Sequence, residues 1–214
     1  MTLTVALILA FPLFVGLTFG VLGVLRPESA ALLHAPVTYL AVLSGLAAAV
    51  WALTPPDLLP RPWLVAGEAL TPALWVVGGA AAGITLFAIE RALLVRRRPQ
   101  PAAATPIKRL GAPEVASLLV IAGVEEWLYR GVLLQALVVV GLTVPVALAV
   151  SAVAFGLNHV AFGPAAVASK SVFGVVWGGL ALASGGVAAC IASHVAFNAA
   201  VCSPLNRRAA ADPS

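Results

Sequence analysis

Long uncharged stretches dominate this sequence. The first, residues 2–25, contains no Asp, Glu, Lys or Arg. Across all 214 residues only 9% are charged and 62% are hydrophobic, whereas soluble domains average about 25% charged residues. This composition excludes a soluble enzyme, a disordered chain and a nucleic-acid binder with a basic face. Within lipid, only helices and closed barrels satisfy the backbone, and a barrel would alternate apolar and polar residues. The unbroken blocks therefore predict an all-α bundle of transmembrane helices.

Seven apolar blocks approach or exceed the roughly 20 residues that cross a bilayer. The first lacks the basic start and compact core of a signal peptide, so we expect it to be retained. The fourth is interrupted by charges and could form one span or a longer tilted helix, so counts of six to eight also fit. The expected spans are residues 2–25, 35–53, 63–95, 113–140, 144–159, 164–183 and 186–202.

A basic linker at residues 96–112 divides the chain into an N-terminal three-span region, residues 1–95, and a helical core, residues 113–203. A short tail, residues 204–214, follows. If the N-terminus is outside, the linker and the tail lie inside, and together they carry most of the basic residues. The outer loops then hold only one basic residue, Arg61. Cytoplasmic loops are enriched in Lys and Arg. We therefore expect a multi-pass plasma-membrane protein with its N-terminus out and its C-terminus in.

Three charges fall within six residues in the interior of the fourth block, where each costs about 2.5–3.5 kcal/mol to insert. Glu126 and Arg130 are four residues apart, on one helical face, and can pair. Glu125 lies about 140° around the helix from Arg130 and has no cation on its own helix. We interpret the pair as structural and Glu125 as chemically active. The alternative is one buried salt-bridge network of all three.

Two further blocks contribute histidines. His159 closes the fifth block in Phe155-x-x-x-His159, and the seventh places His194 and Asn198 on one face. Polar groups on three different spans should converge inside the bundle, because facing lipid would leave them without partners. Asn158 is rotated by about 100° from His159, so it is a secondary candidate, which we interpret as structural.

These residue types predict a hydrolase that uses water as its nucleophile. A carboxylate desolvated among apolar helices can act as a general base. A nearby imidazole can share the water, and a second histidine with an amide can stabilise a developing oxyanion. Serine is disfavoured as the nucleophile, because none lies in Gly-x-Ser-x-Gly.

Taken in order, these motifs resemble the CPBP family, the CAAX-protease and bacteriocin-processing intramembrane proteases. The aromatic Tyr129 and Gly131 on either side of Arg130 also resemble the family, and the likeness covers residues 113–203. The three matching motifs are Glu125-Glu126-x-x-x-Arg130, Phe155-x-x-x-His159 and His194-x-x-x-Asn198.

The resemblance implies an intramembrane endopeptidase that cleaves a membrane-embedded or lipidated peptide or protein within the lipid bilayer. It implies Glu125 as the water-activating carboxylate with His159 assisting. His194 and Asn198 would bind the oxyanion, and Glu126 with Arg130 would support the site. The family usually has eight helices, one more than the seven expected here.

A zinc site is an alternative, because Glu125, His159 and His194 match a known catalytic ligand set. We favour a site without a cofactor, since His-Glu-x-x-His is absent and Asn198 is a poor zinc ligand but a suitable oxyanion donor. Two non-protease alternatives also stay open: a catalytically idle scaffold or bacteriocin-immunity protein, and a small proton-coupled transporter. Lys170, early in the sixth block, has no assigned role and could snorkel toward the interface.

Overall fold

The computed structural model describes residues 36–54, 70–96 and 110–203, and nearer the N-terminus residues 5, 6, 8–12, 15 and 18. Much of the first predicted span and most of the basic linker lie outside the described residues. Within them the chain is helical throughout, with turns between the helices. The elements are α3 (Pro36–Leu53), α4 (Leu70–Arg96), α5 (Ala112–Glu126), η1 (Trp127–Leu133), α6 (Leu134–Val139), α7 (Val144–Leu157), η2 (Val160–Phe162), α8 (Pro164–Ser184) and α9 (Ala188–Cys202).

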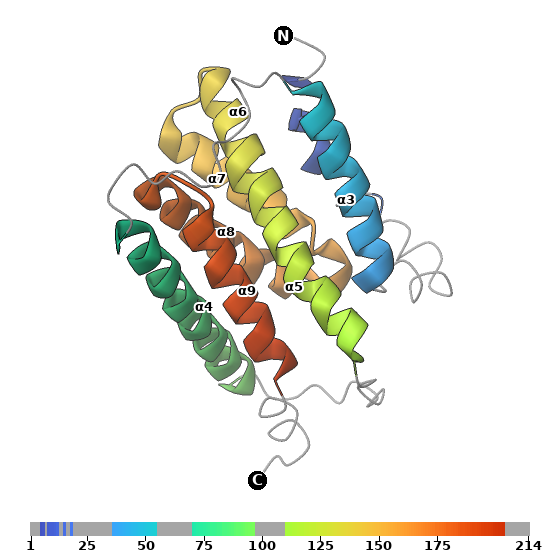
Figure 1. The fold of residues 1–214 in the computed structure, drawn as a ribbon, viewed down its shortest axis with the longest axis vertical. Helices are drawn as coiled ribbons and strands as arrows, with labels where there is room; N and C mark the ends of the chain where they lie inside the picture. The colour runs from blue at the N-terminus through green and yellow to red at the C-terminus, as the bar shows by residue number, and fades with distance from the viewer. Residues whose placement is uncertain are drawn as a thin grey trace.

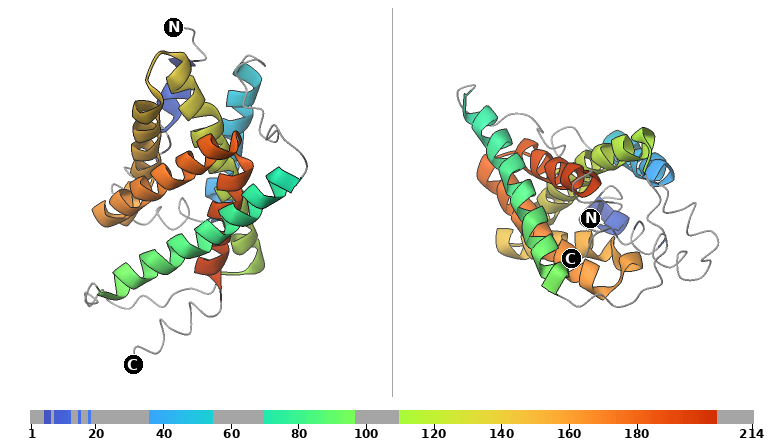
Figure 2. Two further views of the ribbon diagram at one scale, coloured as in Figure 1. Left: turned by 90° about the vertical axis from the view of Figure 1, so that its left-hand side faces the viewer. Right: turned by 90° about the horizontal axis from the view of Figure 1, so that it is seen from below.

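The helix α5 lies in the middle of the front layer of the bundle (Figure 1). It packs between α3 on one side and α9 on the other, and α4 runs along the outer side of α9 (Figure 1). The pair α7 and α8 packs together behind this layer, and α8 also contacts α9 (Figure 2). The helical bundle predicted from the apolar blocks is thereby confirmed.

The packing of α4 against α9 depends on two glycines. A Cβ atom at Gly79 would collide with the carbonyl of Ala189, and one at Gly83 would collide with the carbonyl of Ser193. Small residues let helix backbones approach closely, which is how helices associate in membranes. The close contact fixes α9, which carries His194, against the outer helix.

Among the described residues, three helices are long and apolar enough to cross a bilayer: α3, residues 71–93 of α4, and α8. The shorter α7 and α9 are also apolar. Large apolar side chains on α4 point outward, including Val77 at 67% and Leu74 at 63% exposure. Such a surface is suited to lipid rather than water, so the chain is an integral membrane protein, and seven spans remains a prediction.

One segment departs from α-helical geometry. Trp127–Leu133 forms a π-helix directly after the two glutamates, and the N–H of Leu134 donates to the carbonyl of Tyr129. Short π-segments inside helices frequently mark functional sites. The α-helical register assumed from the sequence therefore holds only as far as Glu126.

Candidate functional site

Glu126 belongs to a buried ionic cluster. Its side chain is fully buried, and Oε1 accepts hydrogen bonds from Arg130 Nη1 at 3.1 Å and from His194 Nδ1 at 2.9 Å. The ion pair predicted between Glu126 and Arg130 is confirmed. His194, on α9, is tied to this cluster.

Arg130 has two further contacts that fix its guanidinium. Its Nη2 donates to the carbonyl of Gly174 on α8 at 3.1 Å, and its Cζ lies 4.5 Å from the centroid of the Phe155 ring. A guanidinium over an aromatic face is attracted by the ring quadrupole. Arg130 thereby links α5 and η1 to both α7 and α8.

Glu125 has a different environment, although it is adjacent in sequence. It is 4% exposed, and its Oε1 accepts a hydrogen bond from the hydroxyl of Tyr39 at 2.8 Å and one from Nδ2 of Asn158 at 3.2 Å. Asn158 Nδ2 also lies 2.6 Å from the Tyr39 oxygen. Among the described residues Glu125 forms no salt bridge. Two neutral donors therefore orient this carboxylate without neutralising its charge.

His159 lies just beyond the end of α7. The helix ends at Leu157, whereas the sequence predicted that the fifth span would continue to residue 159. Its Nδ1 is 3.1 Å from the carbonyl of Phe155. Because a carbonyl can only accept, Nδ1 must carry the proton, which leaves Nε2 of the neutral ring with a lone pair. Nε2 can therefore accept a proton.

His194 is held by an aromatic neighbour as well as by Glu126. Its ring stacks on Trp177 of α8 with centroids 4.0 Å apart and planes 17° from parallel. Trp177 in turn donates from Nε1 to Oγ of Ser193 at 3.0 Å. The imidazole plane is therefore fixed by its neighbours on α5 and α8.

Asn198, one turn after His194, reaches a different helix. Its Nδ2 donates to the carbonyl of Leu118 on α5 at 3.1 Å. This bond fastens α9 to α5 and occupies one of the two amide N–H groups expected to face an oxyanion.

The ring of Phe155 brings the two polar clusters together. Its centroid lies 5.0 Å from that of His159, 5.8 Å from that of His194 and 5.3 Å from that of Tyr129. The two predicted histidines thus both lie near one aromatic core residue. Of the six predicted site residues, only Glu126, Arg130 and His194 share one hydrogen-bonded group. Glu125 bonds to Tyr39 and Asn158, whereas His159 and Asn198 each bond to a backbone carbonyl.

Several polar atoms in this region are buried without a hydrogen-bond partner among the described residues. They include the hydroxyl of Tyr129, Oε2 of Glu126 and Oδ1 of Asn158. Each such atom costs about 1–3 kcal/mol unless a partner is supplied. Two of these three atoms belong to the hydrogen-bonded groups of Glu125 and Glu126.

If the site held zinc, its expected ligands would be Glu125, His159 and His194. In the part of the chain that the structure describes, no group of three or more His, Cys, Asp or Glu side chains is placed to hold a metal ion. Glu125 is bonded to a tyrosine and an amide, and His194 is bonded to the other glutamate. These three side chains are not gathered as a ligand set in this arrangement.

Lys170 has a partner that the sequence did not indicate. Its Nζ lies 3.1 Å from Oε1 of Glu90 on α4, and over the rings of Phe173 and Phe197 at 5.0 and 4.3 Å from their centroids. This half-buried pair joins α4 to α8, so Lys170 is tied to a carboxylate within the bundle.

Sequence reasoning missed Tyr39 and assigned Asn158 to structure. Tyr39 is 86 residues from Glu125 and belongs to no motif. Asn158 directly contacts Glu125, whereas His159, its neighbour, does not bond to it. The only sequence signal for Tyr39 was its rarity, because the chain has two tyrosines.

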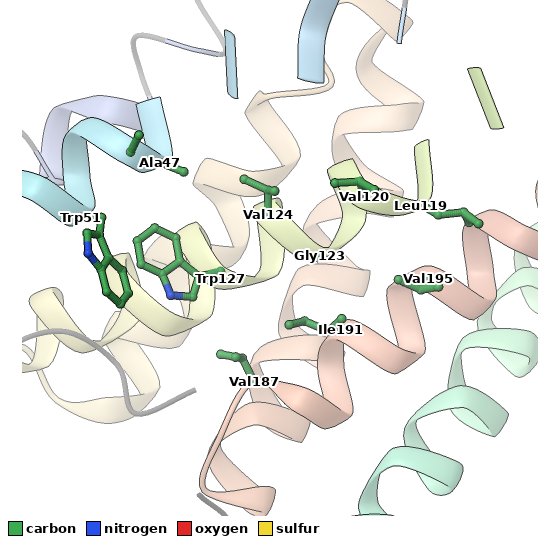
Figure 3. A pocket seen from close by; sticks show the side chains of 11 residues that line it. Ala47, Trp51, Leu119, Val120, Gly123, Val124, Trp127, Val187, Ile191 and Val195 are labelled. Atoms are coloured by element: carbon green, nitrogen blue, oxygen red, sulfur yellow. The ribbon is translucent and has the colours of Figure 1, made fainter. Parts of the chain in front are cut away.

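An apolar groove of about 550 Å³ lies between α3, α5 and α9 (Figure 3). Trp51 and Trp127 lie side by side at one end, with ring centroids 6.0 Å apart. Val120 and Trp127 line it, and these positions are about 140–160° around the helix from Glu125. The groove therefore faces away from the catalytic candidates and is suited to a lipid chain.

Residues 112–200 match the family model described as type II CAAX prenyl endopeptidase Rce1-like. The match contains all three motifs and confirms the resemblance to the CPBP family over this segment. The matched segment is thus similar to a CAAX-type endopeptidase in general. No curated protein and no solved structure matches the chain.

Proposed function

We propose that this protein is a glutamate-type intramembrane endopeptidase that hydrolyses a peptide bond of a lipidated substrate, with Glu125 as the general base. One observation supports this most strongly: Glu125 is buried and oriented by two neutral donors, while the adjacent Glu126 takes Arg130 and His194 as partners. A buried carboxylate without a cationic partner gains by accepting a proton. Glu125 is therefore suited to taking one from water.

The proposed reaction begins with a water molecule between Glu125 and the scissile carbonyl. As the water oxygen bonds to the carbonyl carbon, its proton moves to Glu125 and the carbonyl π electrons move to oxygen. The tetrahedral intermediate then collapses: the C–N bond breaks and the leaving amine takes the proton from Glu125. His159 assists through the lone pair of Nε2, which the Nδ1 contact with Phe155 leaves available.

The remaining residues have roles in binding and support. We assign His194 and Asn198 to the oxyanion, as the family resemblance implies. Glu126 and Arg130 hold His194 and the π-segment in place through the buried cluster. General-base catalysis of this kind contributes about 10²–10⁴-fold.

The test is cleavage of quenched fluorescent peptides by purified full-length protein in lipid nanodiscs. One peptide ends in a farnesylated cysteine followed by three residues, the form that prenylation produces, and its control lacks the lipid. We expect cleavage of the lipidated peptide, and a loss of at least about 100-fold in kcat for Glu125→Gln.

Glu114→Gln is the matched control, because it exchanges a glutamate in the first turn of the same helix. Glu125→Gln retaining wild-type kcat would refute the mechanism. Activity that is lost to a chelator and restored by zinc would refute the metal-free site.

A further inference from the structure

Oxyanion stabilisation requires donors that are free to point at the substrate. The two expected from the sequence are both engaged elsewhere. Asn198 donates from Nδ2 to Leu118, and His194 Nδ1 is 2.9 Å from the Glu126 carboxylate. With its proton at Nδ1, His194 can donate from Nε2 only when the ring is doubly protonated. The expected set therefore keeps one neutral N–H, the second on Asn198, and lacks a second neutral donor.

Tyr129 has the properties of that donor. Its side chain is fully buried, and its hydroxyl has no hydrogen-bond partner among the described residues. Phenylalanine would fill the same space without the unpaired hydroxyl, so packing alone does not account for tyrosine here. A buried hydroxyl without an acceptor points to an acceptor that arrives with the substrate.

The hydroxyl belongs to the proposed site. Tyr129 follows Glu125 by four residues, about one helical turn, in the π-segment that begins directly after the two glutamates. The Tyr129 ring meets Phe155 edge-on at 5.3 Å, and Phe155 is the residue that both site histidines contact. The hydroxyl therefore lies within the group of side chains around the proposed base.

The backbone beneath Tyr129 is also fixed. Its carbonyl accepts two hydrogen bonds, from the N–H of Leu134 in the π-segment and from Oγ of Ser151 on α7 at 2.9 Å. On its other side the ring packs against Phe11 at 5.2 Å. A donor held in this way costs little to orient during the reaction.

We propose that the Tyr129 hydroxyl is a catalytic group that donates a hydrogen bond to the scissile carbonyl oxygen as it becomes negative. The inference rests on the proposed function and extends it. When the water oxygen bonds to carbon, the π electrons that move to oxygen are stabilised by this O–H. The proton stays on Tyr129 throughout, so the balance of the hydrolysis is unchanged.

The test compares Tyr129→Phe with the wild type in the nanodisc assay on the farnesylated peptide, together with the thermal unfolding midpoint of each protein. Removing one oxyanion donor lowers kcat by about 10²–10³-fold. We expect a loss of that size for Tyr129→Phe, with KM within about threefold and no fall in the unfolding midpoint, because an unpaired buried hydroxyl is being removed.

Ser184→Ala is the matched control. Its buried hydroxyl is paired, donating to the Gly186 carbonyl at the end of α8, so its removal should lower the midpoint and leave kcat unchanged. A kcat for Tyr129→Phe within threefold of wild type overturns the inference, as does a midpoint lowered as far as in Ser184→Ala. If either of these outcomes is found while Glu125→Gln is inactive, the inference about Tyr129 fails but the proposed function stands. If the wild type cleaves nothing, both fail.

Discussion

Removing the cation from the buried cluster should destabilise this protein more than any change at its other intramembrane ion pair. The perturbation is Arg130→Met, which keeps an unbranched apolar side chain of similar length. It leaves the Glu126 carboxylate fully buried with His194 as its remaining partner. It also removes the donor to the Gly174 carbonyl and the cation above Phe155.

The expected loss is about 3 kcal/mol of unfolding free energy. Breaking a buried ion pair by removing one partner costs about 3–5 kcal/mol, chiefly because the other charge stays buried. The lower end applies here, since His194 Nδ1 still meets Glu126 Oε1 at 2.9 Å. Replacing both charges removes the uncompensated carboxylate, so Glu126→Gln with Arg130→Met should lie within about 1 kcal/mol of wild type.

The assay is reversible unfolding in mixed detergent micelles, followed by near-ultraviolet circular dichroism. Lys170→Met is the control, because Lys170 and Glu90 are 17% and 20% exposed at their side chains. Pairs that keep contact with solvent contribute about 0–1 kcal/mol, so this variant should lose no more than that. The reasoning is refuted if Arg130→Met costs less than 1 kcal/mol, or if the double variant is less stable than the single one.

Two other changes test the site and the fold. Tyr39→Phe removes one of the two hydrogen bonds to Glu125. A charge-assisted hydrogen bond contributes about 1.5 kcal/mol, so we expect kcat for the farnesylated peptide to fall roughly tenfold. An unchanged kcat would contradict a positioning role for Tyr39. Gly83→Ala places a methyl group against the Ser193 carbonyl and should cost about 1–3 kcal/mol of unfolding free energy. Gly78→Ala, where the space is open, should change it by about 0.5 kcal/mol at most, and equal losses for the two variants would show that α4 does not depend on the close approach.

Helix bounds in the core were predictable because prolines and glycines mark them. The sixth block was expected at residues 164–183 and α8 runs from Pro164 to Ser184, while the second was expected at 35–53 and α3 runs from Pro36 to Leu53. Proline fits the first turn of a helix, where its missing N–H has no partner to lose. The ion pair of Glu126 and Arg130 followed from spacing alone.

The π-segment was not predictable from the apolar pattern. Residues 132–134 are all apolar and all buried, so no alternation of polar and apolar positions reports a change of helical register. Uniformly apolar segments also give no indication of which polar residues, distant in sequence, will bond to one another. Tyr39 and Glu125 are 86 residues apart, and Lys170 and Glu90 are 80 apart. Such pairs are created by helix packing and leave no local signal.

The two adjacent glutamates explain why a motif of this kind needs both. Neighbouring residues on an α-helix point about 100° apart, so Glu125 and Glu126 cannot share one set of partners. The cluster around Glu126 contains the arginine and a histidine, and it holds together parts of α5, α8 and α9. Because those groups are committed there, the charge of Glu125 meets only neutral donors. Under the proposed mechanism, Glu126 holds the arginine and the histidine and Glu125 accepts the proton, and environments that differ in this way separate a base from its support.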